Sequence, residues 1–379
     1  MNSTSTGPDE RDLRIVQDLF FEQDVDILAV SYRHGVTRSL FVLLRSLFLS
    51  RRCGMRLAAR IASGASIAVV FFPNEFQAIA KAGDQLPVHE ILRLDPHSLA
   101  IVREQLGWSG LCREIVRFTR LASALKGWRR IGTFTYPLLG WLLYQTFCVL
   151  LHGKSGITLI TTNMQHPLSL GVAWAAVSMH QASDFYEHAT TPRVVVRDRG
   201  YRNVYVNFEH TRHMLLESGF QPERVHVLQR VAALPAQRAA QPIREVGICI
   251  NFFDSLQSIA DITQVLQEHG LHVSYRVHDA DPRLPRLKRL AAAHGIALSD
   301  ARQSAIESFL RTVDLIVSGN SNVIADALMA GRPVVYYWSG ATDMFDYYGL
   351  VSHYALPHAC DRSSLHAVMN QLLGATAPC

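Results

Sequence analysis

A cluster of short polar side chains follows an apolar segment near the C-terminus. Residues 313–318 are predicted to form a buried strand, and residues 321–330 the helix that follows it. The start of a helix attracts negative charge, and open α/β sheets bind ligands at the carboxyl ends of their strands. A carboxylate one turn into the helix can also reach a ribose hydroxyl. The residues predicted to bind a nucleotide here are Ser318, Asn320, Ser321, Asn322, Asp326 and Gly331.

The bulk composition fits a chain with two folded domains. It has 379 residues, of which 49% are hydrophobic and 18% charged, enough apolar material for two cores. The net charge of +5 is a mild basic excess, which argues against a nucleic-acid binder and suits a protein that handles phosphates or touches an anionic membrane. Six scattered cysteines and a polar N-terminus without an apolar signal segment predict a cytoplasmic location.

Strands alternate with helices along most of the sequence, which predicts parallel sheets with helices on both faces. We expect a disordered tail at residues 1–12, an N-terminal domain at 13–231 and a C-terminal domain at 243–379, joined by the Ala-, Gln- and Pro-rich segment 232–242. The predicted strands cover residues 25–30, 65–72, 156–161, 194–196, 203–206, 224–228, 245–251, 271–277, 313–318 and 333–338.

Two apolar segments raise the question of membrane contact. Residues 131–151 contain no charged side chain and follow a basic stretch, so they are a candidate transmembrane span, although the alternative of a buried or membrane-apposed helix is favoured. Residues 39–60 are apolar and basic and are predicted either to lie on a membrane surface or to form a core helix with solvated arginines.

Residues 326–335, with the sequence DALMAGRPVV, resemble the E-A-x-x-x-G-x-P-V signature of GT-B glycosyltransferases. The serine and asparagine turn before them is similar to that of bacterial capsule and wall-polymer transferases, which include sialyltransferase-like enzymes and CDP-glycerol glycerophosphotransferases. The resemblance implies an α/β chain of two Rossmann-like domains facing a central cleft. It also implies that the turn contacts the donor phosphate and that Asp326 holds the donor ribose, with a reach one carbon shorter than the usual glutamate.

A second motif supports the same family. Arg276 and His278 follow a predicted strand and resemble the R-x-H-P loop of these transferases, although the proline here arrives only at position 282. The resemblance implies that His278 binds the donor phosphate, since an imidazole can donate a hydrogen bond and, when protonated, offset leaving-group charge. Both residues are therefore predicted to belong to the donor site.

The acceptor side is predicted in the N-terminal domain. A turn after the first predicted strand holds the candidate acceptor-binding residues His34, Gly35 and Arg38. The catalytic base is predicted to be Glu187, with His188 as the second choice and His166 and Asp184 behind them. The pair at 187 and 188 stands where related transferases carry a Gln-His-Gly loop.

Together these features predict a metal-independent glycosyltransferase without a resident cofactor. It would move a sugar from a nucleotide-sugar donor to a saccharide or lipid-linked acceptor of a cell-surface polysaccharide or glycolipid, on the inner face of the cytoplasmic membrane if the basic segment docks there. Three alternatives remain open. They are a CDP-glycerol-type glycerophosphotransferase, an NDP-sugar 2-epimerase with paired carboxylates, and a non-catalytic nucleotide-binding protein.

Overall fold

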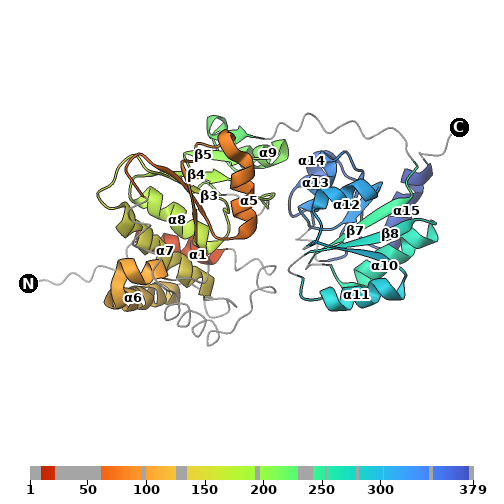
Figure 1. Cartoon of the computed structure of the whole chain (residues 1–379), viewed down its shortest axis with the longest axis horizontal. Coiled ribbons are helices and arrows are strands. Elements are labelled where there is room, and N and C mark those ends of the chain that lie inside the picture. Colours follow the sequence, from red (N-terminus) through yellow and green to blue (C-terminus); the bar gives the residue numbers. More distant parts are fainter. Residues whose placement is uncertain are drawn as a thin grey trace, which may run out of the picture. The chain divides into compact units, whose positions relative to one another are not determined.

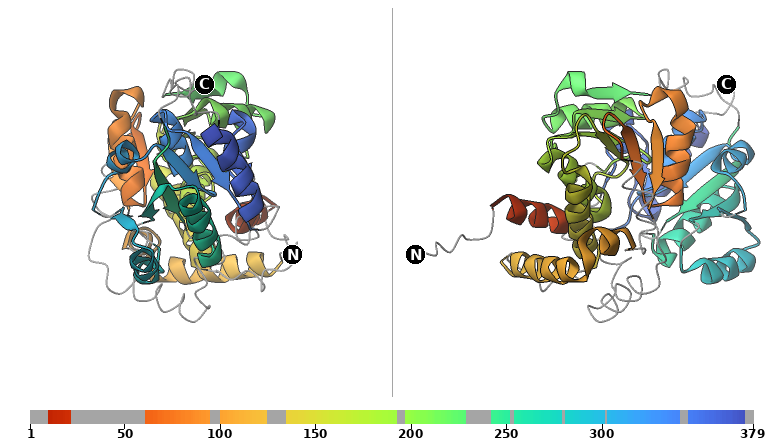
Figure 2. Two further views of the ribbon diagram at one scale, coloured as in Figure 1. Left: turned by 90° about the vertical axis from the view of Figure 1, so that its right-hand side faces the viewer. Right: turned by 60° about the vertical axis from the view of Figure 1, so that its left-hand side comes forward.

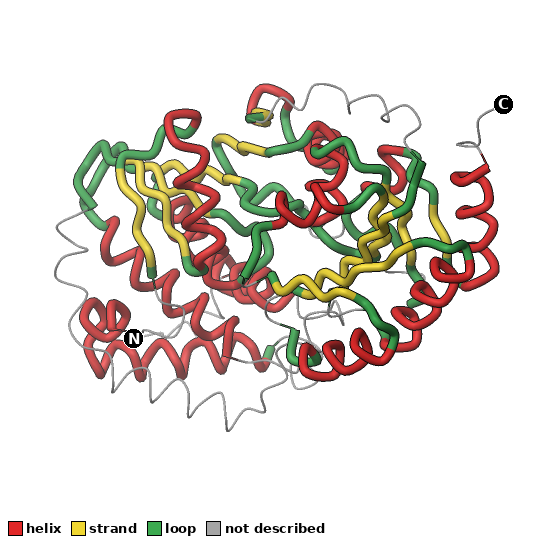
Figure 3. The backbone as a smooth tube through the Cα atoms, turned by 45° about the vertical axis from the view of Figure 1, so that its right-hand side comes forward, coloured by secondary structure: helices red, strands yellow, loops and turns green. Residues whose placement is uncertain are grey.

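The computed structural model describes residues 10–21, 61–94, 100–124, 135–192, 197–228, 242–251, 254–278, 281–301, 303–340 and 345–374. The chain divides into two compact units (Figure 1). The first holds most of the chain up to residue 229, and the second holds residues 230–379 with short pieces at 192–194 and 208–210. Each unit is built on a parallel sheet of six strands with helices packed against it, as the α/β prediction requires (Figure 3).

The sheet of the first unit has the strand order β2-β1-β3-β4-β5-β6, and every neighbouring pair is parallel. Apolar runs explain β1 and β3, since both are buried along their whole length. Its strands are β1 (Ser66–Val70), β2 (Glu90–Arg93), β3 (Thr158–Thr161), β4 (Ala182–Tyr186), β5 (Asn203–Val206) and β6 (Val225–Val227).

Helices cover the two faces of this sheet unequally. On one face α8 contacts β1, β3 and β4. Helices α1 and α7 pack on α8, and α6 packs on α1 and α7. On the other face α5 lies against β1 and β2, as the right-hand view of Figure 2 shows in orange. The helices are α1 (Glu10–Phe21), α5 (Pro73–Ala82), α6 (Ala100–Ser123), α7 (Thr135–Leu151), α8 (Pro167–Ser178) and α9 (Glu209–Glu217).

Within the candidate membrane span 131–151, the described residues 135–151 form a core helix, in line with the favoured alternative of a buried helix. Within 131–151, α7 begins at residue 135, and Trp141, Leu142 and Phe147 are fully buried against the rest of the first unit. Its lack of charge therefore reflects burial on several sides within the protein. None of the described helices has the combination of length and apolar character that a bilayer crossing requires.

The predicted N-terminal tail is too long at its C-terminal end. Helix α1 begins at Glu10, so residues 10–12 are helical and not disordered. Asp12 is buried in the first turn of α1 and forms an ion pair with Arg117 of α6. A charge removed from water in this way requires an ordered partner.

The sheet of the second unit has the order β12-β11-β10-β7-β8-β9. Counted from the first strand of the unit, this is the 3-2-1-4-5-6 order of a dinucleotide-binding Rossmann sheet. The strand order reverses between β7 and β10, which pair directly. Its strands are β7 (Glu245–Ile250), β8 (His272–Val277), β9 (Ala297–Asp300), β10 (Leu315–Ser318), β11 (Val334–Tyr337) and β12 (His358–Ala359).

Two separate cores hold helices to the faces of the second sheet. One contains apolar residues of α10, α11 and α15, and the other contains those of α12, α13 and α14. Gly247 in β7 is required by close packing, because a Cβ atom there would lie 2.8 Å from the ring of Phe309. The helices are α10 (Leu256–Glu268), α11 (Leu284–Ala293), α12 (Ile306–Thr312), α13 (Val323–Met329), α14 (Leu350–Tyr354) and α15 (Arg362–Gly374).

Candidate functional site

The carboxyl ends of β7, β8 and β10 bring polar residues to one edge of the second sheet. These three strands are neighbours, and the strand order reverses between β7 and β10. Open α/β sheets bind ligands at such a switch point because the loops of adjacent strands diverge there. The described polar residues that follow the three strands and are not buried include Asp254, His278, Ser321 and Asn322.

Two asparagines fix the framework of this edge. Asn251, directly after β7, donates from its side-chain amide to the backbone oxygen of Asn320. The side-chain oxygen of Asn320 accepts hydrogen bonds from the Tyr336 hydroxyl at 2.8 Å and from the Tyr347 N–H at 3.1 Å. Asn320 is buried, so its predicted role in donor binding becomes one of shaping the loop after β10.

The turn after β10 still offers atoms to a ligand. The Ser321 hydroxyl accepts a hydrogen bond from the Val323 N–H at 3.3 Å, just before α13 begins. The side-chain oxygen of Asn322 is inaccessible to solvent and has no partner in the described part of the chain. Leaving such an acceptor unpaired costs roughly 1–3 kcal/mol, a cost that would be recovered if the side chain turned to accept a hydrogen bond from a ligand. The helix itself is shorter than predicted, since α13 spans only Val323–Met329.

Three predicted donor residues are placed where they serve the fold. Ser318 is buried and donates to the Cys249 backbone oxygen at 2.9 Å, which ties β10 to β7. Arg276 points to the loop after β9 and donates to the Ser299 hydroxyl at 2.7 Å and to backbone and side-chain oxygens of Ser304. Gly331 has a φ of 68° and ends α13 at the far end from the turn. We therefore assign these three residues structural roles instead of the predicted contacts with the donor.

Two other predicted residues keep positions compatible with donor binding. The backbone N–H of His278 donates to the Ile250 backbone oxygen at 3.2 Å and so extends the pairing of β8 with β7. The side chain of His278 is exposed. Asp326 lies in α13 and is partly exposed, one turn beyond Asn322. Their predicted roles toward phosphate and ribose stay predictions.

Asp254 is a member of this edge that the sequence analysis did not single out. One carboxylate oxygen, Oδ2, accepts a hydrogen bond from the Asn251 N–H at 2.8 Å, and burial raises the pKa of the carboxyl group to about 7. The signal that could have found it was its place directly after a buried strand, the same place that selected the other candidates.

In the first unit, His166 and His188 come together at the carboxyl ends of β3 and β4. His166 caps α8 by accepting a hydrogen bond from the Leu168 N–H at 3.4 Å, and its ring makes T-shaped contacts with the rings of Phe72 and Tyr136. Burial, reinforced by the neighbouring His188, lowers the pKa of His166 to about 3, so its ring is neutral at physiological pH.

His188 is oriented by the loop after β3. Its Nδ1 atom contacts the backbone oxygen of Thr162, which can only accept a hydrogen bond. Nδ1 must therefore carry the proton, and in the neutral ring Nε2 holds the free electron pair. The side chain is half-buried. An imidazole held in this way by a carbonyl group is arranged as a general base.

Glu187, the first choice for the base, is enclosed by the protein. Its carboxylate is fully buried and accepts hydrogen bonds from the Thr191 N–H at 2.9 Å, the Asn207 N–H at 2.7 Å and the Thr211 hydroxyl at 2.9 Å. Burial raises its pKa to about 7 despite these three donors. The side chain thus holds together the loops after β4 and β5 and the first turn of α9.

Replacing Glu187 with alanine is expected to lower the free energy of unfolding by about 2–4 kcal/mol. The three donors that it satisfies would be left buried without a partner. Urea denaturation measures the loss, and Glu223→Ala, at an exposed position, is the matched control. A change below about 0.5 kcal/mol, the usual size at exposed sites, would show that the carboxylate does not hold these loops.

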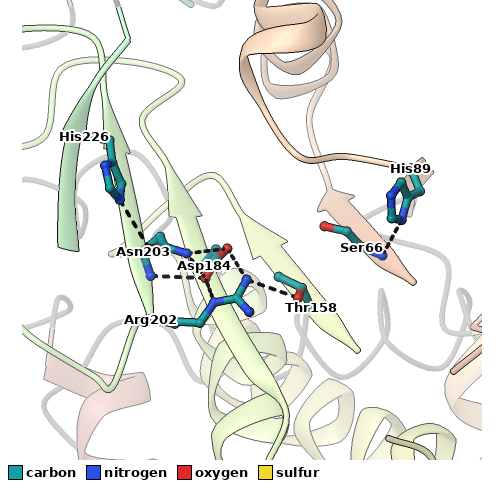
Figure 4. Close-up of polar contacts among 7 residues, drawn as sticks. All are labelled: Ser66, His89, Thr158, Asp184, Arg202, Asn203 and His226. Carbon is teal, nitrogen blue, oxygen red and sulfur yellow. Dashed lines mark hydrogen bonds and ion pairs between the residues drawn. The ribbon is translucent and has the colours of Figure 1, made fainter. Parts of the chain in front are cut away.

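Asp184 lies apart from these loops on the face of the first sheet. Figure 4 shows it between Arg202 and Asn203, in contact with both. Its buried carboxylate pairs with the Arg202 guanidinium through bonds of 3.2 and 2.8 Å and accepts the Asn203 N–H at 3.1 Å. Arg202 also donates to the Thr158 hydroxyl at 3.2 Å. Asp184 therefore joins β3, β4 and β5, which is a structural role and not that of a base.

The predicted acceptor residues His34, Gly35 and Arg38 lie outside the described residues, as does the basic segment 39–60. Within the ranges that the structure describes, no group of three or more His, Cys, Asp or Glu side chains is arranged to hold a metal ion.

Neither a family model nor a curated protein matches the chain. Among solved structures, a putative UDP-N-acetylglucosamine 2-epimerase from Listeria monocytogenes is similar, with a TM-score of 0.48 and 12% identity over 83% of this chain and 88% of that one. A UDP-GlcNAc 2-epimerase from Neisseria meningitidis bound to UDP-GlcNAc gives 0.49 and 10% over 82% and 91%. A spinosyn rhamnosyltransferase complexed with thymidine diphosphate gives 0.44 and 13% over 82% and 92%. At these identities the activity has to be inferred from the chain's own residues.

Proposed function

We propose that this protein is a glycosyltransferase that takes a sugar from a nucleotide-sugar donor and passes it to a hydroxyl group of a saccharide or lipid-linked acceptor. The second unit would hold the donor and the first unit would supply the base. The GT-B resemblance of residues 326–335 agrees with this division of roles.

The observation that carries the proposal is the arrangement at the strand-order reversal of the second unit. There the sheet has the order that binds nucleotides in Rossmann domains, and the loops after β7, β8 and β10 present Asp254, His278 and the turn at 321–322 together. A turn of the partly buried Asn322 side chain would bring its unpartnered oxygen to a ribose hydroxyl, and the exposed His278 is a donor suited to a phosphate oxygen.

The proposed reaction moves one proton, forms one bond and breaks another. Nε2 of His188 takes the proton of the acceptor hydroxyl, whose oxygen forms the new bond to the anomeric carbon of the sugar. The bond between that carbon and the donor phosphate breaks, and the nucleotide leaves with the electron pair. His278 stabilises the charge that develops on the leaving phosphate.

A thermal-shift panel of CMP, CDP, UDP, GDP and ADP tests donor binding directly. A matching nucleotide at about 100 times its Kd is expected to stabilise the protein by about 2.7 kcal/mol. Asn322→Ala should weaken the effect because it removes an acceptor from the site. Asn370→Ala, at an exposed position on α15, should leave the effect intact.

Product analysis then tests transfer. The expected product of a nucleotide-sugar and an acceptor mixture is a glycosylated acceptor with release of the free nucleotide. No shift with any nucleotide would contradict donor binding. Turnover that yields only an epimerised nucleotide-sugar would contradict transfer and favour the epimerase alternative.

A further inference from the structure

Asp254 presents one carboxylate oxygen to the middle of the proposed donor site. Its Oδ2 is held by the Asn251 N–H, while Oδ1 has no hydrogen-bond partner among the described residues. A Cβ atom built on Gly319 would lie 3.0 Å from Oδ1, so this oxygen sits directly over the turn that follows β10. The carboxyl group therefore occupies the junction of β7 and β10, where the strand order reverses.

The backbone around Asp254 is held by a single arginine. Arg283 donates to the backbone oxygens of both Asp254 and Asn251, the latter at 2.6 Å. The same guanidinium pairs with Asp281 at 2.7 Å. Its charge is thus shared with a second carboxylate and is directed at the main chain, so it offsets the charge of the Asp254 carboxylate only in part.

Among the residues that the structure describes, Arg283 is the only cation whose charge acts on Asp254. The other titratable groups described around it are Asp281 from the segment before α11, Cys249 from β7 and Tyr336 from β11. Burial raises the pKa of the Cys249 thiol and of the Tyr336 hydroxyl, which keeps both neutral. Burial is also the largest influence on Asp254 and brings its pKa to about 7, with Asp281 raising it and Arg283 lowering it.

A donor phosphate at this edge would meet the free oxygen of Asp254. An ionised carboxylate would repel it, whereas a carboxylic acid can donate its O–H to a phosphate oxygen. We propose that Asp254 binds the donor phosphate as a neutral acid, so that donor binding takes up one proton from solvent. The proton joins Oδ1, the new O–H donates to a non-bridging phosphate oxygen, and no covalent bond of the donor changes. This inference rests on the proposed function, because it requires a nucleotide-linked donor at this edge.

Calorimetric titration of the full-length wild-type protein tests the proton uptake. The probes are UDP-N-acetylglucosamine, GDP-mannose and CDP-glycerol, and the one that binds most tightly is used for the titration. The diphosphate of each probe is esterified at both ends, so its charge stays constant between about pH 6 and about pH 8. Buffers with different ionisation enthalpies then report the number of protons exchanged. We expect an uptake that approaches one proton as the pH rises above the pKa of the free protein.

The direction of the pH dependence follows from the two pKa values. Binding raises the pKa of Asp254 above its value of about 7 in the free protein, so affinity is highest below that pH. Above that pH, each binding event must take up a proton from solvent. Kd should therefore rise by up to about tenfold per pH unit until the pKa of Asp254 in the complex is reached.

Asp254→Asn is the matched variant, because the amide group has a similar shape and donates without titrating. It should bind the probe with no proton uptake and with a Kd that is constant over the same pH range. Asp261→Asn, at a partly exposed position of α10 that pairs with Gln257, should keep the wild-type pH dependence. Binding by the wild type without proton uptake would overturn the inference while leaving the proposed function standing. Failure of every nucleotide probe to bind the wild type would overturn the proposed function, and this inference with it.

Discussion

Replacing His188 with alanine is expected to lower kcat for glycosyl transfer by roughly 10²–10⁴-fold, the usual contribution of a positioned general base. The backbone oxygen of Thr162 fixes the proton on Nδ1, so Nε2 is the atom that receives the acceptor proton. Donor affinity should not change, because the proposed donor site is built from strand ends of the second unit. Steady-state transfer kinetics and nucleotide titration measure these two quantities separately.

The matched control is His152→Ala, which removes an exposed histidine that follows α7 in the same unit. Added imidazole should restore part of the lost turnover in His188→Ala, since it supplies the missing base without a covalent link. A kcat within about threefold of wild type would exclude His188 as the base, because a loss that small is below what loss of a general base produces. A loss of nucleotide affinity in the variant would show instead that His188 supports the donor site.

His188 and Glu187 are adjacent in sequence but differ in what their polar atoms already contact. Three protein donors occupy the two oxygens of Glu187, and the residue is fully buried. His188 uses one nitrogen to fix its orientation and remains half-buried. A base must reach the proton that it removes, so geometry decides between the two side chains before pKa does.

Much of the fold could be predicted from apolar patterning alone. Most strands of both sheets were recognised as short apolar runs, because strands covered by helices on both faces read as continuous apolar segments. Strand β4, with the sequence ASDFY, was missed because Ser183 and Asp184 interrupt the run. These residues can be buried there because Arg202, 18 positions further along, neutralises Asp184. No local pattern indicates that pairing.

The site was predicted less completely, for a related reason. The strand-order rule selects an edge for the proposed donor site once the strands are known, and the sequence motif selected the turn at 318–322. It could not tell which polar side chains point to a ligand. Ser318 and Arg276 turn inward to hold neighbouring strands and loops, whereas Asp254 keeps an oxygen free. Side-chain direction depends on long-range packing, which spacing along the chain does not report.

Replacing Gly171 with alanine is expected to lower the free energy of unfolding by at least about 3 kcal/mol, the upper end of the cost of overpacking. A Cβ atom at this position of α8 would lie 2.1 Å from the backbone oxygen of Gly140 in α7. One at Gly140 would in turn lie 2.4 Å from the backbone oxygen of Pro167. Because the obstacles are backbone atoms, the two helices would have to move apart along their whole crossing.

The matched control is Gly110→Ala, which is expected to raise the free energy of unfolding instead of lowering it. Gly110 lies in α6, where a Cβ atom would meet its nearest neighbour at 3.4 Å, so Gly110→Ala should stabilise the protein by about 0.5–1 kcal/mol through helix propensity. Urea denaturation of both variants measures the contrast. It also tests the interpretation of α7 as a core helix, because a segment that left the first unit for a lipid phase would not need the close approach to α8. Equal stability of Gly171→Ala and the wild type would mean that α7 and α8 do not cross at these glycines in solution, and the burial that explains the uncharged sequence of α7 would have to be abandoned.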